Sequence, residues 1–487
     1  MGSHEDRALR DHAQALMRGG RIGEAEEVLR AHALARPNDH EALALLAQIA
    51  SMERRLDEAE SLLMRAIRGD RARADYQALL AEVLTTAGRH REAIGRYDHA
   101  LKLHRDYDAA HAGKAETYLR MGKVDRAMAA LQRAPDTPIT AIPRLRALSR
   151  QGAYEDAIAV ARAHLPATSA SNDVQRGLWF GLGHACERAK LIDEAFEAIS
   201  RANALSTGGW TDEGDRHRND VLMSTFSAEA VPTLPRSDCQ SERPIFVVGL
   251  PRCGSTLVEQ IIDAHPDAAG VGEIETLSKL VLDMPSRLGT KLPWPELLQE
   301  TNEQGLGMIA QAYLDDLAAR SPDASRVVDK QLGNFVHVGL ISLLFPKARI
   351  IHCRRNPMDL GLSIWTQKLP PGTNAFASDL RAIGTAWRLA QNLMEHWTRV
   401  LEYPILAVDY EALVADLEGQ TRRMLEFCDL PFDERCLRFW ESGRTVLTLS
   451  SDQVRQPIYR SSVGRHEAWG ALLDPLRDGV QQEQGRR

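Results

Sequence analysis

The chain has 487 residues, of which 44% are hydrophobic and 26% are charged, and its formal net charge is −7. This length exceeds a single ordinary core and predicts two or three domains. The acidic balance excludes the basic signature of a dedicated nucleic-acid binder, and no apolar run approaches the about 20 residues that span a bilayer. The six cysteines form no Cys-x-x-Cys pair and no zinc-like spacing. We therefore expect a reduced, cytoplasmic protein that binds neither nucleic acid nor membranes.

A period of 34 residues runs through the N-terminal half. Alanines recur at 25, 59, 93 and 127, and five residues earlier stand Gly20, Arg54, Gly88 and Gly122. Small residues at this period let two antiparallel helices approach closely, and a glycine ends the first helix in a left-handed conformation. The period and residue types resemble the tetratricopeptide repeat, which implies an all-α superhelix of five or six helix pairs over residues 6–206. Such arrays often bind peptides on their concave face; dimerisation, or packing alone, stays open.

Glycine and proline mark a boundary after the repeats. Thr207-Gly-Gly209 and Val231-Pro-Thr-Leu-Pro-Arg236 interrupt the helical pattern, which predicts a linker over residues 207–243. We expect a nucleotide domain over residues 244–475. Residues 476–487 become increasingly polar and predict a disordered tail.

Residues 245–264 have the pattern of a strand, a glycine loop and a helix. The apolar, β-branched run Ile245–Val248 suits a buried strand, and Gly249-Leu-Pro-Arg-Cys-Gly-Ser-Thr256 follows it. This order aims backbone N–H groups and a helix N-terminus at an anion. Ser255 stands where the phosphate loop of nucleoside triphosphatases has a lysine, which argues against an ATPase or kinase. A glycine loop alone is also compatible with an ordinary strand–turn–helix.

A second anion site is indicated further along the chain. The strand Arg349–Cys353 leads to Arg355, Pro357 suits the first turn of a helix, and Ser363 lies about two helical turns on. A guanidinium and a hydroxyl can hold a terminal phosphate through charge-assisted hydrogen bonds. The alternative is a pair of surface arginines before a helix.

Together these motifs resemble the sulfotransferases that depend on 3′-phosphoadenosine 5′-phosphosulfate (PAPS), particularly the protein-tyrosine branch and bacterial members with tetratricopeptide repeats. The resemblance covers about residues 244–470. It is densest in three blocks, which are Pro251–Leu257 with Asp263–Pro266, Asp329-Lys330 through Arg349–Cys353, and Arg355-Asn-Pro357 with Ser363. It implies a P-loop-like α/β domain with a parallel sheet, in agreement with the strand–loop–helix pattern, and the transfer of sulfonate from PAPS to an acceptor hydroxyl.

The resemblance implies two anion sites for PAPS. The loop around Arg252 would hold the 5′-phosphosulfate, and Arg355 with Ser363 would hold the 3′-phosphate, which ATP lacks. Tyr410 resembles the adenine-side tyrosine, and Arg465 resembles a basic residue of the segment that covers the nucleotide, with Gln453 and Arg455 as weaker candidates. The nucleotide-binding residues implied are Arg252, Cys253, Gly254, Ser255, Thr256, Leu257, Arg355, Ser363, Tyr410 and Arg465.

Sulfonate transfer needs a base for the acceptor hydroxyl and a cation for the leaving group. The resemblance assigns the cation to Lys330, together with Arg252, and the base to Glu273, so we expect no catalytic metal. Glu275 stays an alternative base, because a short alignment gap would exchange the two glutamates. His265 is less favoured, because a His-Pro pair after a helix is typical of a helix end. A carboxylate needs help to deprotonate a phenol, so we expect partial burial to raise the pKa of Glu273.

The leading hypothesis is a sulfotransferase that acts on a peptide or protein tyrosine, with the repeats helping to present the acceptor. One alternative is a sulfotransferase for a small-molecule or carbohydrate hydroxyl, with repeats that serve oligomerisation. The other is a repeat scaffold whose nucleotide domain is degenerate. The presence of Arg252, Glu273, Lys330, Arg355 and Ser363 in one chain argues against the scaffold.

Overall fold

The computed structural model describes residues 2–165, 170–206, 209–369, 372–441 and 462–481. The chain divides into two compact units, Met1–Leu205 and Ser206–Arg487, and each has hydrophobic clusters of its own. None of the described helices is both long and apolar enough to cross a membrane.

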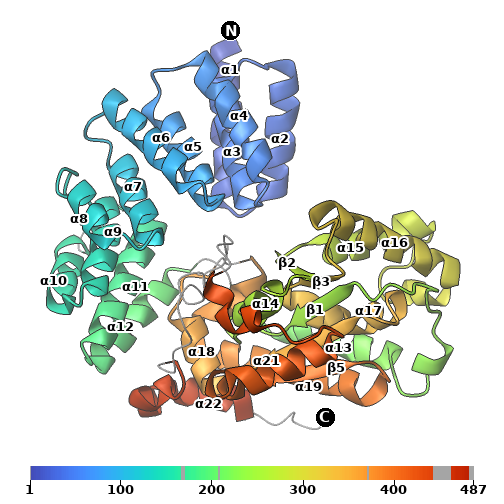
Figure 1. Cartoon of the computed structure of the whole chain (residues 1–487). Helices are drawn as coiled ribbons and strands as arrows, with labels where there is room; N and C mark the ends of the chain where they lie inside the picture. The colour runs from blue at the N-terminus through green and yellow to red at the C-terminus, as the bar shows by residue number, and fades with distance from the viewer. Residues whose placement is uncertain (1, 166–169, 207–208, 370–371, 442–461, 482–487) are drawn as a thin grey trace. The chain divides into compact units, whose positions relative to one another are not determined.

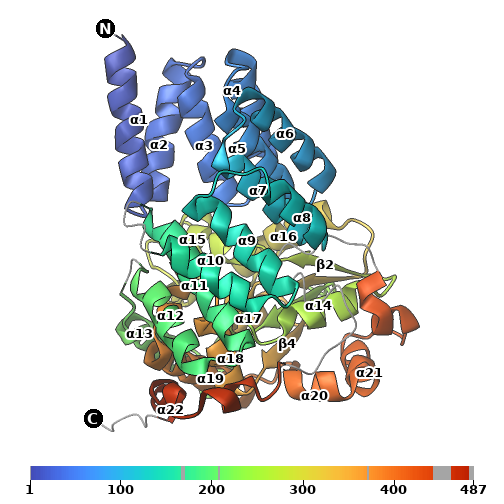
Figure 2. The same cartoon turned by 90° about the vertical axis from the view of Figure 1, so that its left-hand side faces the viewer.

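Six helix pairs make up the described part of the first unit, and consecutive pairs stack side by side (Figures 1 and 2). The pairs are α1 (Gly2–Arg18) with α2 (Ile22–Ala35), α3 (His40–Met52) with α4 (Leu56–Gly69), α5 (Ala74–Thr86) with α6 (His90–Leu103), α7 (Asp108–Arg120) with α8 (Val124–Leu131), α9 (Pro138–Arg150) with α10 (Tyr154–His164), and α11 (Asn172–Arg188) with α12 (Ile192–Ala204). The all-α repeat array expected from the 34-residue period is confirmed.

The periodic residues occupy the positions that the repeat requires. The periodic alanines are fully buried between helices, and they are Ala25, Ala59, Ala93 and Ala127. The turn between the helices of a pair is left-handed at Gly20, Gly88 and Gly122, with φ of 76°, 78° and 72°. Arg54 has the same conformation, with φ of 61°, although its Cβ makes that conformation costly. The period therefore outweighs the local preference of this residue.

The second unit is built on a five-stranded parallel sheet with the order β2-β3-β1-β4-β5. The strands are β1 (Pro244–Val248), β2 (Ala268–Gly272), β3 (Arg326–Asp329), β4 (Arg349–Arg354) and β5 (Ile405–Asp409). The helices are α13 (Glu213–Thr225), α14 (Ser255–Asp263), α15 (Thr276–Leu288), α16 (Glu303–Arg320), α17 (Val338–Leu344), α18 (Pro357–Trp365), α19 (Leu380–Val400), α20 (Tyr410–Ala415), α21 (Leu417–Phe427) and α22 (Asp474–Gln481). Short 3₁₀ helices are η1 (Val231–Thr233), η2 (Glu296–Gln299), η3 (Leu332–His337), η4 (Gly372–Ser378), η5 (Glu434–Glu441) and η6 (Arg465–Leu473). The predicted α/β fold is thereby confirmed.

Helices cover both faces of the central strand β1, whose five residues are all buried. Phe246 and Val248 belong to a large hydrophobic cluster with residues of α15, α16, α17 and α19. Ile245 and Val247 alternate with them and point to the opposite face, where α14 contacts the sheet along β1 and β2. Burial on both faces explains why the strand is a continuous apolar run.

The structure corrects the linker that we predicted over residues 207–243. Within that range α13 contacts α19, and Leu222, Phe226 and Val231 belong to the core cluster of the second unit. Only a narrow edge of α13 is buried, so its sequence is mostly polar and resembles a connecting segment. This stretch is part of the second unit rather than a linker.

The tail predicted over residues 476–487 is also partly wrong. Residues 474–481 form α22, which packs against α19 with Leu476 fully buried. Two glycines allow this close approach, because a Cβ on Gly384 would lie 2.4 Å from the Leu476 carbonyl oxygen and one on Gly479 would lie 2.3 Å from the Arg381 carbonyl oxygen. A polar helix that packs through glycine leaves little hydrophobic pattern in the sequence. Residues 482–487 lie outside the described part of the chain.

Candidate active site

Each strand of the sheet ends one residue before a position that the sequence assigned to the site. β1, β2, β3, β4 and β5 lead directly into Gly249, Glu273, Lys330, Arg355 and Tyr410. Because the five strands are parallel, their carboxyl ends lie along one edge of the sheet. The chain order reverses at β1, and ligands of open α/β sheets bind at such a switch point.

The loop between β1 and α14 has the tight curvature of a phosphate-binding loop. Arg252 and Gly254 adopt left-handed conformations, with φ of 71° and 97°. A Cβ on Gly249 would lie 2.8 Å from the Cys353 carbonyl oxygen, and one on Gly254 would lie 2.6 Å from the Tyr410 ring. Glycine is therefore required at both positions, and α14 begins at Ser255 with its first N–H groups directed toward the loop.

The side chains of this loop differ in what they can offer a ligand. Ser255 and Thr256 are buried in the first turn of α14, and Leu257 packs into the core. The side chain of Cys253 is also buried, so Cys253 can offer only its backbone to a ligand. Hydrogen bonding between the Cys253 and Cys353 thiols lowers the pKa of Cys253 and raises that of Cys353. All six cysteines of the chain are free thiols.

The residues predicted for the second anion site converge on the same loop. Arg252 Nε donates to Ser363 Oγ at 3.1 Å, and Arg355 Nη1 donates to the Arg252 carbonyl oxygen at 3.0 Å. The Arg355 guanidinium also lies 4.8 Å from the centre of the Tyr410 ring. Among the described residues, Arg355 Nε is buried without a hydrogen-bond partner. A buried cationic donor that lacks an acceptor fits an anionic ligand such as a phosphate.

Lys330 and Glu273 form a close ion pair between β3 and β2. Lys330 is 0% exposed, and its Nζ lies 2.5 Å from Glu273 Oε1 and 4.0 Å from Glu259 Oε2. The Glu273 side chain is 45% exposed, so it is only partly buried. Because Glu273 follows the last residue of an edge strand, its side chain lies at the surface. It contacts the buried Lys330 from the solvent side.

The two alternative bases lie elsewhere. Glu275 directly precedes α15, its side chain is 63% exposed, and it pairs with Lys279 at 3.1 Å. His265 is buried, where Nδ1 accepts from the Asp267 N–H at 3.1 Å and Nε2 lies 2.9 Å from the Pro431 carbonyl oxygen. Since both ring nitrogens have backbone partners, His265 connects loops of the fold. Of the three candidates, Glu273 is the one at Lys330.

Two buried carboxylates near Lys330 were not assigned a role from the sequence. Asp329 accepts from Tyr313 Oη at 2.8 Å and Asn334 Nδ2 at 3.1 Å, and burial raises its pKa to about 7. Glu259 accepts from the Gly272 N–H at 2.8 Å. A glutamate within the apolar run of α14 is a signal that could have identified Glu259.

The segment predicted to cover the nucleotide is described only from residue 462 onward. Its Ser462 carbonyl oxygen accepts from Arg355 Nη2 at 2.7 Å, and Arg465 Nη2 donates to Thr366 Oγ1 at 3.4 Å. Gln453 and Arg455 lie outside the described residues.

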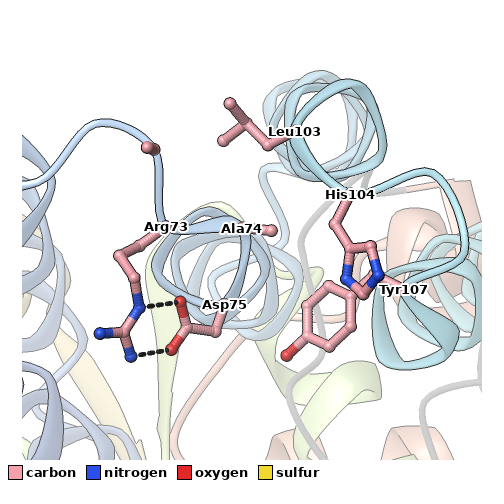
Figure 3. Close-up of a pocket in the computed structure, with 7 residues that line it drawn as sticks. Arg73, Ala74, Asp75, Leu103, His104 and Tyr107 are labelled. Atoms are coloured by element: carbon pink, nitrogen blue, oxygen red, sulfur yellow. Dashed lines mark hydrogen bonds and ion pairs between the residues drawn. The ribbon is translucent and has the colours of Figure 1, made fainter.

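Two other features of the described residues bear on ligand binding. No group of three or more His, Cys, Asp or Glu side chains among them could hold a metal ion. The repeat array has a surface pocket of about 310 Å³, in which Arg73 and Asp75 form a two-bond ion pair and His104 stacks on Tyr107 (Figure 3). Its lining residues are Ala72, Arg73, Ala74, Asp75, Leu103, His104 and Tyr107. None of them belongs to the predicted catalytic or nucleotide-binding set.

Comparison with known proteins agrees with this division of the chain. Residues 244–434 match the model of the sulfotransferase family. The chain carries a sulfotransferase-family domain. Residues 10–77 and 84–138 match tetratricopeptide-repeat models, so the sulfotransferase domain follows an array of a kind that typically mediates protein interactions.

The relatives are distant in sequence and longer than the matched region. An uncharacterized protein of Aquifex aeolicus (strain VF5) is 36% identical over 338 residues, which are 68% of this chain and 44% of that protein. Protein-tyrosine sulfotransferase A of Caenorhabditis elegans is 29% identical over 223 residues, which are 44% of this chain and 58% of that protein. The chain spans about half the length of these curated relatives. The crystal structure of PilW, a type IV pilus biogenesis factor, is 18% identical with a TM-score of 0.34, and the match covers 41% of this chain and 92% of that one.

Proposed function

We propose that the chain is a PAPS-dependent sulfotransferase with a peptide or protein tyrosine as the acceptor. One observation carries the proposal: Glu273, Lys330 and Arg355 directly follow parallel strands that end along one edge of the sheet, and Arg252 lies in the loop after β1, within a domain of the sulfotransferase family. A degenerate scaffold has no need of a buried lysine paired with a carboxylate beside a phosphate-binding loop.

The donor side would use both anion sites. Arg252 and the backbone at the start of α14 would hold the 5′-phosphosulfate, and Arg355 with Ser363 would hold the 3′-phosphate. The buried Nε of Arg355, which has no partner among the described residues, supports this assignment. Tyr410, which packs against Arg355, would lie on the adenine side, and Arg465 would contribute from the segment that follows residue 461.

The chemistry is an in-line displacement at sulfur. A bond forms between sulfur and the acceptor oxygen while the bond between sulfur and the 5′-phosphate oxygen breaks. Glu273 would take the proton of the acceptor hydroxyl, and Lys330 with Arg252 would stabilise the negative charge that develops on the departing phosphate oxygen. The proposed base and the proposed cation lie next to each other, with 2.5 Å between Glu273 Oε1 and Lys330 Nζ.

Two observations support a tyrosine acceptor. The C-terminal part is distantly similar to protein-tyrosine sulfotransferases, and a carboxylate follows β2 at the position of the proposed base. The repeats would bind the acceptor peptide or mediate dimerisation. We further propose a cytoplasmic location, since all six cysteines are free thiols and disulfides are rare in the cytosol.

Incubation of the purified chain with PAPS and a panel of tyrosine peptides, carbohydrates and small hydroxyl compounds tests the proposal. We expect some tyrosine peptides to gain the mass of one SO₃ group by intact-mass analysis. A gain confined to carbohydrates or small molecules would reassign the acceptor. A chain that binds the nucleotide and modifies nothing in the panel would contradict the tyrosine proposal.

A further inference from the structure

Asp359, in the first turn of α18, holds a distant segment of the chain against that helix. Its side chain is 1% exposed. Oδ2 accepts from the Gly464 N–H at 2.7 Å, and Oδ1 accepts from the His466 N–H at 2.9 Å and from His466 Nδ1 at 2.8 Å. Burial opposes the charged form of Asp359, but the hydrogen bonds from His466 and Gly464 hold its pKa below the usual value. Three donors on an ionised carboxylate make a strong connection.

The same segment contacts a donor-site residue before this connection, and it contacts the C-terminal end of α18 within and after the connection. Before it, the Ser462 carbonyl oxygen accepts from Arg355; within it, Arg465 reaches Thr366 beyond the end of α18. After it, Trp469 packs edge-on against Trp365 at 6.0 Å between ring centres. Residues 462–466 therefore run along the helix that also presents Ser363.

Asp359 and Ser363 lie on the same face of α18, because they are four residues apart. Ser363 accepts from Arg252, whereas both oxygens of Asp359 accept from Gly464 and His466. The carboxylate oxygens of Asp359 already accept hydrogen bonds from other residues of the chain. Asp359 can therefore affect a ligand only through the segment that it holds.

We infer that Asp359 is a positioning residue of the donor site, which holds residues 462–466 on α18 so that Arg465 adds to the recognition of the 3′-phosphate. This inference rests on the proposed function, because the 3′-phosphate site is itself part of that proposal.

The test is the ratio of the dissociation constants for 5′-AMP and adenosine 3′,5′-bisphosphate, measured by calorimetry on the full chain. Asp359→Asn keeps the volume but replaces one acceptor oxygen by a donor, so one of the backbone hydrogen bonds must be lost. We expect the ratio to fall about tenfold, which corresponds to about 1.4 kcal/mol, while the affinity for 5′-AMP changes little. Asp416→Asn is the matched control, because Asp416 also accepts a backbone N–H, from Gly419 at the start of α21.

The outcomes separate this inference from the proposed function. A wild-type chain that binds both nucleotides equally would overturn the 3′-phosphate site and the proposed function with it. A wild-type chain that prefers the bisphosphate, together with an Asp359→Asn variant of unchanged preference, would overturn the positioning role alone. Amide exchange at Gly464 and His466 should accelerate in Asp359→Asn and stay unchanged in Asp416→Asn.

Combination with Arg465→Ala tests whether Asp359 acts through Arg465. We expect Asp359→Asn to have little further effect on the ratio in the Arg465→Ala background, and independent, additive effects would contradict the inference. Should Asp359→Asn not fold, His466→Ala replaces it, because the ring of His466 is partly exposed. His466→Asn, which restores a side-chain donor, should then recover the preference for the bisphosphate.

Discussion

Lys330 is a fully buried cation whose charge is balanced from two sides. Burying an ammonium group is costly unless it is paired, and Lys330 has Glu273 at 2.5 Å and Glu259 at 4.0 Å. Glu259 is buried, whereas the Glu273 side chain is nearly half exposed. Glu273 is therefore the partner that can contact an acceptor. If Glu273 is removed, Glu259 still pairs with the lysine.

Glu273→Gln should lower turnover by about 10²–10⁴-fold, which is the usual contribution of general base catalysis. Binding of adenosine 3′,5′-bisphosphate should remain within a few-fold of wild type, because Glu259 still faces Lys330. Turnover is measured with PAPS and a modified acceptor, and Glu275→Gln serves as the control because Glu275 pairs with Lys279. Loss of activity in Glu275→Gln with retention in Glu273→Gln would reverse the assignment of the base.

Asp329 should make folding stability depend on pH. Burial raises its pKa to about 7 in the folded chain, whereas the unfolded chain ionises near the ordinary value. Its stabilising contribution is therefore complete below about pH 4 and lost as the pH rises toward 7, by up to about 1.4 kcal/mol per pH unit. The stability of wild type relative to Asp329→Asn, measured by urea unfolding, should fall between pH 4 and 7. A difference that stays constant or rises over this range would refute the shift.

At the scale of elements, the contact between α19 and α22 depends on glycine. Gly384→Ala would place a Cβ 2.4 Å from the Leu476 carbonyl oxygen and 2.7 Å from the Val480 nitrogen, and backbone atoms cannot rotate away. We expect a loss of about 1–3 kcal/mol in unfolding free energy by urea titration. Gly95→Ala in α6 is the control, since nothing lies within 4 Å of its Cβ position. That change should stabilise by up to about 1 kcal/mol, and equal effects of both variants would contradict the close packing.

The elements that the sequence predicted are those with a local signal. The repeats follow from a period that even places Arg54 in a left-handed turn, and the phosphate-binding loop follows from contiguous residues between a strand and a helix. α13 and α22 were missed because both are mostly polar, and α22 packs through glycine.

The sequence predicted those residues of the site that directly follow a strand, because each lies next to a recognisable local pattern. The pairing of Lys330 with Glu273 joins residues 57 apart in the chain, and the contact between Asp359 and His466 joins residues 107 apart. Such contacts are set by strand order and by the path of the last segment, which no local pattern encodes. The degree of exposure of Glu273 also depends on the position of β2 at the edge of the sheet, which is a property of the whole fold.

At the scale of the whole molecule, the proposed nucleotide-binding residues all belong to the second unit. Adenosine 3′,5′-bisphosphate at 100 times its dissociation constant should stabilise the fold that binds it by about 2.7 kcal/mol. Thermal unfolding of the full chain measures this, and 5′-AMP at the same concentration should stabilise less, because it lacks the 3′-phosphate. Equal stabilisation by the two nucleotides would contradict a site at Arg355 and Ser363.

The strand order separates the proposed roles across the sheet. β1, β4 and β5 lead into the residues assigned to the nucleotide, whereas β3 and β2 lead into Lys330 and Glu273. Among the described strands β2 pairs only with β3, and its register shifts between Gly270 and Gly272. A register irregularity of this kind re-aims the side chains of its strand and is common next to active sites, and the shift lies directly before Glu273. The proposed base therefore follows a strand at the edge of the sheet, whereas Arg252 and Arg355, proposed for the nucleotide, follow strands that have a neighbour on both sides. Engineering of a new acceptor should start at the β2 edge, where changes leave the strands next to the nucleotide untouched.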